Sequence, residues 1–259
     1  MTQKRRKSKV SSPLLDDAGE ARTLSEQAYR VIRAAILECR IPPSAIIDER
    51  ALMKEHGFGR TPVREALLRL SGERLVIFQA GQVIQVAPIG PTDIRDLYEL
   101  RLHSERLAVR LMMERRTPQL VEKLSHCFDA APELLERGQI EETIALDFRF
   151  HALLYEGSGN VFVANMLRNL FGHSYRLWLL TNTGDVEEMR TIVRSHEPIM
   201  DAIRAGDAKR LDYEITEHIT HAYDRVVSIL RGTVIDDLGG LQPLTLDKRK
   251  AARDETVMG

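Results

Sequence analysis

Apolar residues recur at helical spacing along most of this 259-residue chain, and one short stretch departs from that pattern. There, Leu75–Phe78 and Val83–Val86 form two β-rich runs separated by a four-residue turn that contains Gly81, which predicts a β-hairpin. The region before the hairpin predicts three helices. From Pro91 onward the pattern is helical without a strand signal. The predicted fold class is therefore mainly α, with an N-terminal winged helix-turn-helix followed by a C-terminal all-α helical bundle.

The stretch 48–70 predicts two short helices joined by a tight turn. Asp48 is expected to cap the first helix, and Gly57 to provide the left-handed backbone that ends it. Thr61 is expected to cap the second helix, with Pro62 at the first helical position, where the missing N–H is not needed. Apolar residues then recur at helical spacing to Leu70, so one face of this second helix is predicted to be buried.

Three arginines and a threonine lie outside that buried face. Arg60, Thr61 and Arg64 are near the start of the second helix, where a recognition helix meets base edges and phosphates, and Arg50 is at the front of the first. Many helical hairpins have a Gly turn and an Arg-rich outer face without binding DNA. The helix pair alone therefore favours a DNA-binding role without establishing it.

The predicted bundle contains six helices. They cover Pro91 to about residue 115, Thr117 to about Gly138, and then 141–156, 160–180, 185–205 and 208–230. The first is expected to be lined on one face by Ile94, Leu97, Leu100, Leu107 and Leu111. The predicted organisation is a flexible basic arm (1–22), a winged domain (23–88), a bundle (91–232) and a tail (233–259). The arm either contacts DNA phosphates or is only a solvated tail.

Charge is unevenly distributed. Residues 1–90 hold 15 Lys and Arg against 10 Asp and Glu, whereas the remainder holds 22 against 28. This asymmetry suits a nucleic-acid-binding module joined to a domain of another kind. The two cysteines, Cys39 and Cys127, form no paired motif, which is typical of a reducing compartment. The protein is therefore expected to be cytoplasmic. No apolar run reaches the length of a membrane span, so no membrane partner is expected.

A second group of polar residues lies in the predicted bundle. Asp147 and His151 are four residues apart and share a helical face, while His196 and His218 come from two later helices. A bundle can direct all four side chains into its core, where one carboxylate and three imidazoles suit a divalent transition metal. Isolated helical histidines are more often structural or exposed, so spacing alone leaves both readings open. His221 is a possible fifth polar group or a competing ligand.

Several motifs carry a family resemblance over residues 23–232. They are ERALMKEHG, RTPVREALLRL and the hairpin in the first half, and DIRDLYELRLHSERLAVRL and DFRFHALLYEGSGN, with His196 and His218, in the second. In this order they resemble a GntR-family transcription regulator of the FadR type, with the C-terminal ligand domain called FCD. The resemblance implies a homodimer that binds double-stranded operator DNA and acts more probably as a repressor than an activator.

The resemblance also assigns roles to residues. In the winged domain it implies DNA contacts by Arg50, Arg60, Thr61 and Arg64, and by the backbone at Gly81 of the wing. The wing departs from the family pattern because it reads IFQAGQVIQ, without basic residues, and Arg74 stands where Gly is usual.

In the bundle, the resemblance implies that Asp147, His151, His196 and His218 bind a metal, zinc first and nickel or manganese as alternatives. It also implies a small carboxylate effector and places Arg101 towards it, although a solvated or ion-paired role for Arg101 is equally open. The competing function is a metal-dependent enzyme that uses the Asp/His site. No general base stands beside these ligands in the sequence, so a non-enzymatic regulator is expected.

Overall fold

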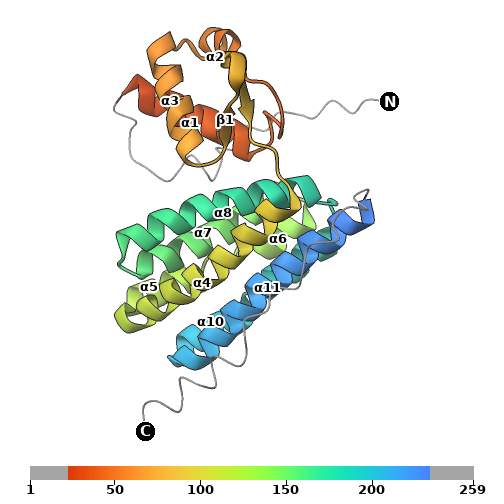
Figure 1. The fold of residues 1–259 in the computed structure, drawn as a ribbon. Helices are drawn as coiled ribbons and strands as arrows, with labels where there is room; N and C mark the ends of the chain where they lie inside the picture. Colours follow the sequence, from red (N-terminus) through yellow and green to blue (C-terminus); the bar gives the residue numbers. More distant parts are fainter. Residues whose placement is uncertain (1–22, 234–259) are drawn as a thin grey trace.

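The computed structural model describes residues 23–233, which form a small winged domain and a larger helical bundle (Figure 1). The predicted basic arm (1–22) and nearly all of the predicted tail (234–259) lie outside the described residues. Within them, the prediction of a mainly α protein with a winged helix-turn-helix and an all-α bundle is confirmed.

Three helices and a two-stranded hairpin make up the winged domain. They are α1 (Leu24–Leu37), α2 (Glu49–His56), α3 (Arg60–Gly72), β1 (Val76–Phe78) and β2 (Ile84–Val86), with a short 3₁₀ turn (Ala80–Gln82) between the strands. The strands pair antiparallel with Val76 opposite Val86. The segment before α2 adds a bridge to the free edge of β2, where Ile47 N donates to Ile84 O at 2.8 Å. Apolar side chains from all three helices and both strands form one core beneath the hairpin.

Two of the three predicted helix-end features of the turn between α2 and α3 are confirmed. Asp48 caps α2 by accepting from the N–H groups of the second and third helical residues, and Gly57 ends the helix at φ 71°. The third was wrong, because α3 begins at Arg60 after Gly59, and Thr61 makes no capping bond. Pro62 is thus the third helical residue, which is tolerated because the first four N–H groups of a helix have no partner inside it.

The bundle contains eight helices among the described residues. They are α4 (Pro91–Arg115), α5 (Pro118–Ser125), α6 (Ala131–Glu136), α7 (Ile140–Gly157), α8 (Val161–Thr181), α9 (Val186–Arg194), α10 (Glu197–Ala205) and α11 (Ala208–Thr233). Two of the six predicted helices are therefore each split in two. In both cases a proline is in the first turn of the second piece, Pro132 in α6 and Pro198 in α10, where it favours a new helix start.

The predicted apolar face of α4 is confirmed in part, because Ile94 is buried and Leu97 and Leu107 pack against the core, but the prediction was wrong for Leu100. Leu100 is 45% exposed, whereas the core face carries Tyr98, Leu102 and Met112. Arg101 and Glu105 occupy positions within this buried face, so the true stripe is interrupted by charge and the leucines beside it give the stronger sequence signal.

Helix α8 lies between the two domains (Figure 1). Its buried residues contribute to the bundle core, and Gly172 at its middle faces α1 so closely that a Cβ there would lie 3.1 Å from Leu37 Cδ1. No helix of the described residues is long and apolar enough to cross a membrane.

Candidate metal centre and effector cavity

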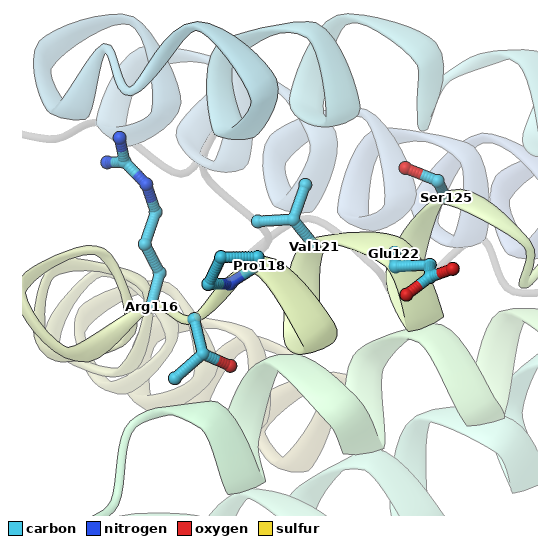
Figure 2. A pocket seen from close by; sticks show the side chains of 6 residues that line it. Arg116, Pro118, Val121, Glu122 and Ser125 are labelled. Atoms are coloured by element: carbon cyan, nitrogen blue, oxygen red, sulfur yellow. The ribbon is translucent and has the colours of Figure 1, made fainter.

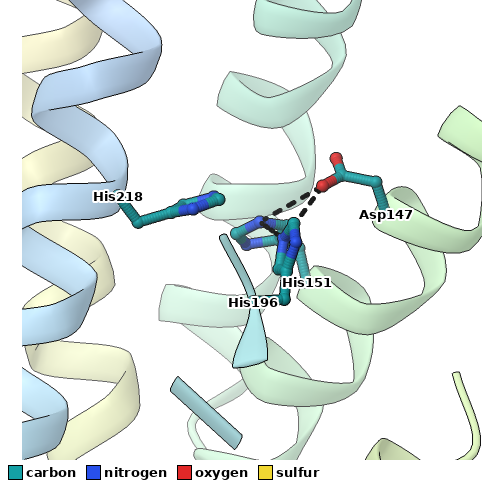
Figure 3. A group of neighbouring side chains, drawn as sticks. All are labelled: Asp147, His151, His196 and His218. Carbon is teal, nitrogen blue, oxygen red and sulfur yellow. Dashed lines mark hydrogen bonds and ion pairs between the residues drawn. The ribbon is translucent and has the colours of Figure 1, made fainter. Parts of the chain in front are cut away.

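Three segments of the bundle bring four polar side chains together (Figure 3). Asp147 and His151 are one turn apart on α7, His196 is in the break between α9 and α10, and His218 comes from α11. One ligand atom from each lies within 4.8 Å of all the others. The side chains of His151 and His196 are almost completely buried, and Asp147 is 7% exposed. The four residues singled out from the sequence are therefore one cluster in space.

The hydrogen bonds of His196 show which of its ring nitrogens carries the proton and which has a free lone pair. Its Nδ1 is 2.9 Å from the carbonyl oxygen of Ile192, which can only accept, so Nδ1 carries the proton. In the neutral ring Nε2 is then a lone pair, yet it faces Asp147 Oδ1 at 3.0 Å and His151 Nε2 at 3.4 Å. The Asp147 carboxylate and this lone pair repel each other unless a proton or a metal ion lies between them.

The other two histidines are oriented in the same way. His151 Nδ1 lies 3.4 Å from both the Tyr155 hydroxyl and Glu105 Oε2, and His218 Nδ1 lies 3.2 Å from Ser195 Oγ. All three rings thus have Nδ1 engaged and Nε2 left for the centre, which is the arrangement that outer polar partners impose on metal-binding histidines. The separations of 3.0, 3.4 and 3.9 Å among Asp147, His151 and His196 also suit ligands that each lie about 2.0–2.2 Å from one ion. The residues present therefore fit a divalent transition metal.

A buried ion pair lies beside the cluster. Arg101 donates to Glu105 Oε1 through Nε and Nη2, at 2.9 and 2.7 Å, and to Ser174 Oγ through Nη1. Burial alone would raise the pKa of Glu105, but Arg101 and His151 outweigh it and hold the pKa at about 2. With Asp147 the centre carries two negative charges against one positive charge. A divalent cation would reverse this sign and make the centre attractive to an anion.

The pKa shifts of Asp147 and His218 both favour binding of a metal ion. Burial raises the pKa of Asp147, but the hydrogen bond with His196 and the nearby His151 outweigh it, so the pKa is lowered and the carboxylate is ionised. Burial, together with the charges of His196 and His151, lowers the pKa of His218 well below its usual value. A neutral His218 presents a lone pair, as a metal ligand must.

A cavity of about 760 Å³ opens beside this cluster. Asp147, His151 and His218 line it, and so does Arg101, which the sequence had placed towards the effector. His221 also lines the cavity but is exposed and outside the four-residue cluster. A second hollow of about 390 Å³ lies where α5 begins (Figure 2). Its lining includes Arg116 and Glu122 and none of the predicted site residues.

Sequence reasoning missed Glu105 and Ser195, which orient two of the histidines. A signal for Glu105 was present, because it is four residues after Arg101 in a helix that is otherwise apolar on that face. Ser195 gave no signal, since its contact with His218 depends on the break between α9 and α10.

In the winged domain, the residues predicted to contact DNA share one exposed region. Arg50, Arg60, Thr61 and Arg64 are all exposed at the front of α2 and α3, and Arg64 Nε is 3.2 Å from Glu49 Oε2. Gly81 is exposed at the hairpin turn with φ 79°. On binding DNA, Arg64 would leave Glu49 and contact a phosphate or a base edge instead.

Arg74 has a left-handed backbone, with φ 59°. This conformation explains why glycine is usual at the position, since a side chain is strained there. The arginine at this position therefore carries a backbone strain that glycine would not.

Fold and cluster together define a winged-helix protein whose all-α bundle contains a buried Asp/His cluster. The family model described as "Bacterial regulatory proteins, gntR family" matches residues 24–86, and the FCD domain model matches residues 96–221. A regulator from Agrobacterium vitis, in the TAR-I ttuE-ttuC' intergenic region, is 30% identical over 151 residues, which cover 56% of this chain and 88% of that protein.

Other relatives agree with these matches. The Escherichia coli transcriptional repressor RspR is 23% identical over 212 residues, covering 80% of this chain and 90% of the repressor. The solved structure of E. coli McbR/YncC superposes with a TM-score of 0.71 at 21% identity, over 82% of this chain and 99% of that one. The chain belongs to the GntR family of bacterial regulatory proteins and carries the FCD domain, the architecture of the FadR subfamily. Its domains and homologues are those of transcription regulators and not of enzymes.

Proposed function

We propose that this chain is a metal-binding repressor that binds operator DNA as a homodimer and releases it, in a metal-dependent way, when a carboxylate enters the bundle cavity. The observation that carries the proposal is the buried cluster of Asp147, His151, His196 and His218 in the wall of that cavity. Zinc is the first candidate, because its usual donors are imidazole and carboxylate, with nickel and manganese as alternatives. Arg50, Arg60, Thr61, Arg64 and the Gly81 backbone would contact the operator.

The metal would give the effector its binding point. With four protein ligands, a five- or six-coordinate ion retains one or two positions at which a carboxylate oxygen can replace water. Arg101 lines the same cavity, but Glu105 already takes two of its N–H groups. The role of Arg101 is then to hold Glu105 and supply positive charge, with Ser174 as the partner that a ligand can replace.

Helix α8 would couple the cavity to the DNA-binding domain, because opposite sides of the helix face each of them. Phe171, Ser174, Tyr175 and Trp178 line the cavity. On the other side, His173 Nε2 is 2.9 Å from the carbonyl oxygen of Glu73, and Arg176 Nη2 donates to that of Ala87 at 2.8 Å. Glu73 follows α3, and Ala87 lies between β2 and α4. A ligand that shifts α8 therefore acts directly on the placement of the winged domain.

Both cross-domain bonds are accepted by backbone carbonyls, so they depend on where the winged domain lies and not on its side chains. A hydrogen bond of this kind contributes about 1 kcal/mol, and two such bonds fall within the usual coupling range of about 1–3 kcal/mol. Coupling of this size would change operator affinity about 5- to 150-fold, provided that the ligand prefers one placement of the domains.

The test is a mobility-shift assay with tag-free full-length protein and DNA from upstream of its own gene. Zinc-loaded protein should bind this DNA specifically at physiological salt, and a carboxylate should weaken binding only when metal is present. Protein with His196→Ala should keep DNA binding and lose the carboxylate response, while His103→Ala, a matched change at an exposed histidine of α4, should keep both. A carboxylate response that survives both chelation and His196→Ala would contradict the proposal.

A further inference from the structure

The cavity is much larger than its polar end requires. At about 760 Å³ it equals the liquid volume of roughly 25 water molecules. It is also within the usual range of about 300–1,000 Å³ for pockets that enclose a drug-sized ligand. A two- or three-carbon acid bound at the metal would leave most of this space to water.

Aromatic rings form much of the remaining wall, which also includes the polar residues Glu188, Thr191, Arg194 and Arg225. Starting from the metal-cluster residue His151, ring centroids follow one another to Phe171 at 4.7 Å, Phe148 at 4.4 Å, Tyr175 at 5.1 Å and Trp178 at 6.2 Å. All five rings line the cavity. Phe148 meets both Phe171 and Tyr175 edge-on, at interplanar angles of 71° and 86°, which is the geometry that aromatic rings prefer when they pack.

This series gives the cavity two chemically different ends. Near His151 are Asp147, His218 and Arg101, the groups that would meet a metal and a carboxylate. Away from it, Ile144, Ile192 and Val226 add aliphatic contacts to the aromatic wall. Any hydroxyl or carboxyl group of a polar acid that lies against these rings would find few hydrogen-bond partners, which costs free energy.

We infer that the effector is an aryl carboxylate, in which the carboxylate binds at the metal end and an aromatic body lies along the rings from Phe171 to Trp178. The inference rests on the proposed function, because it assumes that the metal end receives the carboxylate. Burial of a phenyl group should improve affinity roughly 10- to 150-fold over the same acid without the ring.

The experiment uses zinc-loaded, tag-free full-length protein and the fluorescence of Trp178, which is the single tryptophan of the chain. Three acids are titrated, namely propionate, 3-phenylpropionate and malate, together with the neutral 3-phenylpropanamide. The expected result is that 3-phenylpropionate binds at least tenfold more tightly than each of the others and changes the Trp178 emission. Isothermal titration calorimetry on the same samples detects any binding that leaves the emission unchanged.

Variants then locate the aromatic body. Phe148→Leu removes one ring of the wall and should weaken 3-phenylpropionate roughly 2- to 10-fold without affecting propionate. Phe162→Leu is the matched control, because Phe162 is 84% exposed on α8 and outside the cavity. Equal losses in both variants, or none in either, would overturn the inference.

The acid series separates two kinds of failure. If malate or propionate binds as tightly as 3-phenylpropionate, the aryl assignment is wrong and metal-dependent carboxylate binding stands. If the zinc-loaded protein binds none of the acids, whereas the amide binds, the ring wall recognises a neutral body and the proposed function fails at its carboxylate step. If nothing binds, both are overturned.

Discussion

Replacing His196 should abolish the stabilisation of this protein by metal, and a chelator distinguishes that effect from simple damage to the fold. In wild-type protein, a metal at 100 times its dissociation constant stabilises the folded state by about 2.7 kcal/mol. For a domain of 150–250 residues each kcal/mol shifts Tm by about 2–4 °C, so chelation should lower Tm by about 5–10 °C. In His196→Ala the same chelator should change Tm by less than about 2 °C.

The variant has a cost of its own, which the structure allows to be anticipated. The His196 ring packs against Phe128 and Phe150, with centroids 4.7 and 5.0 Å away, and its Nδ1 bonds to Ile192 O. Loss of that bond costs about 1 kcal/mol, and loss of the ring adds the cost of a cavity in the core. His196→Ala should therefore melt below metal-free wild type, and His196→Gln should recover part of this difference without recovering the response to chelator.

The assay is differential scanning calorimetry of tag-free protein, with and without chelator, supported by elemental analysis. His103→Ala serves as the control, since His103 is exposed on α4 and should leave the chelator effect intact. One result refutes the reasoning, namely an equal chelator effect in wild type and His196→Ala. A wild-type protein with less than one metal ion per chain after incubation with excess zinc and desalting would refute it as well.

Three further predictions concern other parts of the molecule. Arg64→Ala should weaken operator binding by about 1–3 kcal/mol in a mobility-shift titration, while Arg110→Ala, an exposed change on α4, should not; equal effects would exclude a base contact. Arg74→Gly should raise the free energy of unfolding by about 0.5–1 kcal/mol in a urea titration. The change relieves a left-handed residue that costs about 1–2 kcal/mol, but part of this gain is lost because glycine increases the entropy of the unfolded chain. A loss of stability would show that the contacts of the arginine side chain outweigh the strain of its backbone. His173→Ala should speed thiol labelling of Cys39 roughly fivefold, because one cross-domain bond of about 1 kcal/mol is lost; an unchanged rate would mean that this bond does not hold the domains together.

The labelling assay depends on the position of Cys39 at the domain boundary. Its Sγ is 3.9 Å from the carbonyl oxygen of Arg176, and burial raises the pKa of the thiol. Cys39 is partly buried at this boundary, so separation of the domains should expose its thiol further and speed labelling. Cys127 provides an internal reference, because it is 5% exposed in the bundle core and burial raises its pKa to about 11. An effector that shifts α8 should speed labelling of Cys39 alone.

Much of the architecture could be predicted from local patterns. The hairpin at Gly81, the cap at Asp48 and the helix end at Gly57 depend on residues within one turn of chain, where backbone preference and side-chain hydrogen bonds act directly. The pairing of Asp147 with His151 is equally local, because helical periodicity places residues four apart on one face. His196 and His218 were added by family resemblance, and the fold was needed to bring them within 4.8 Å of that pair.

Tertiary structure decided what local patterns could not express. Glu105 and Arg101 lie within the buried face of α4, where the apolar pattern gave no sign of them and included the exposed Leu100 instead. Only packing against α7 and α8 makes that charged pair part of the site. The break that turns His196 and Ser195 towards His218 also depends on how α9 and α10 pack. The same holds for α8, whose sequence is continuous and helical but which has the cavity on one side and the winged domain on the other. Contacts between residues far apart in sequence follow from the packing of whole elements, because the free energy of burial does not depend on chain order.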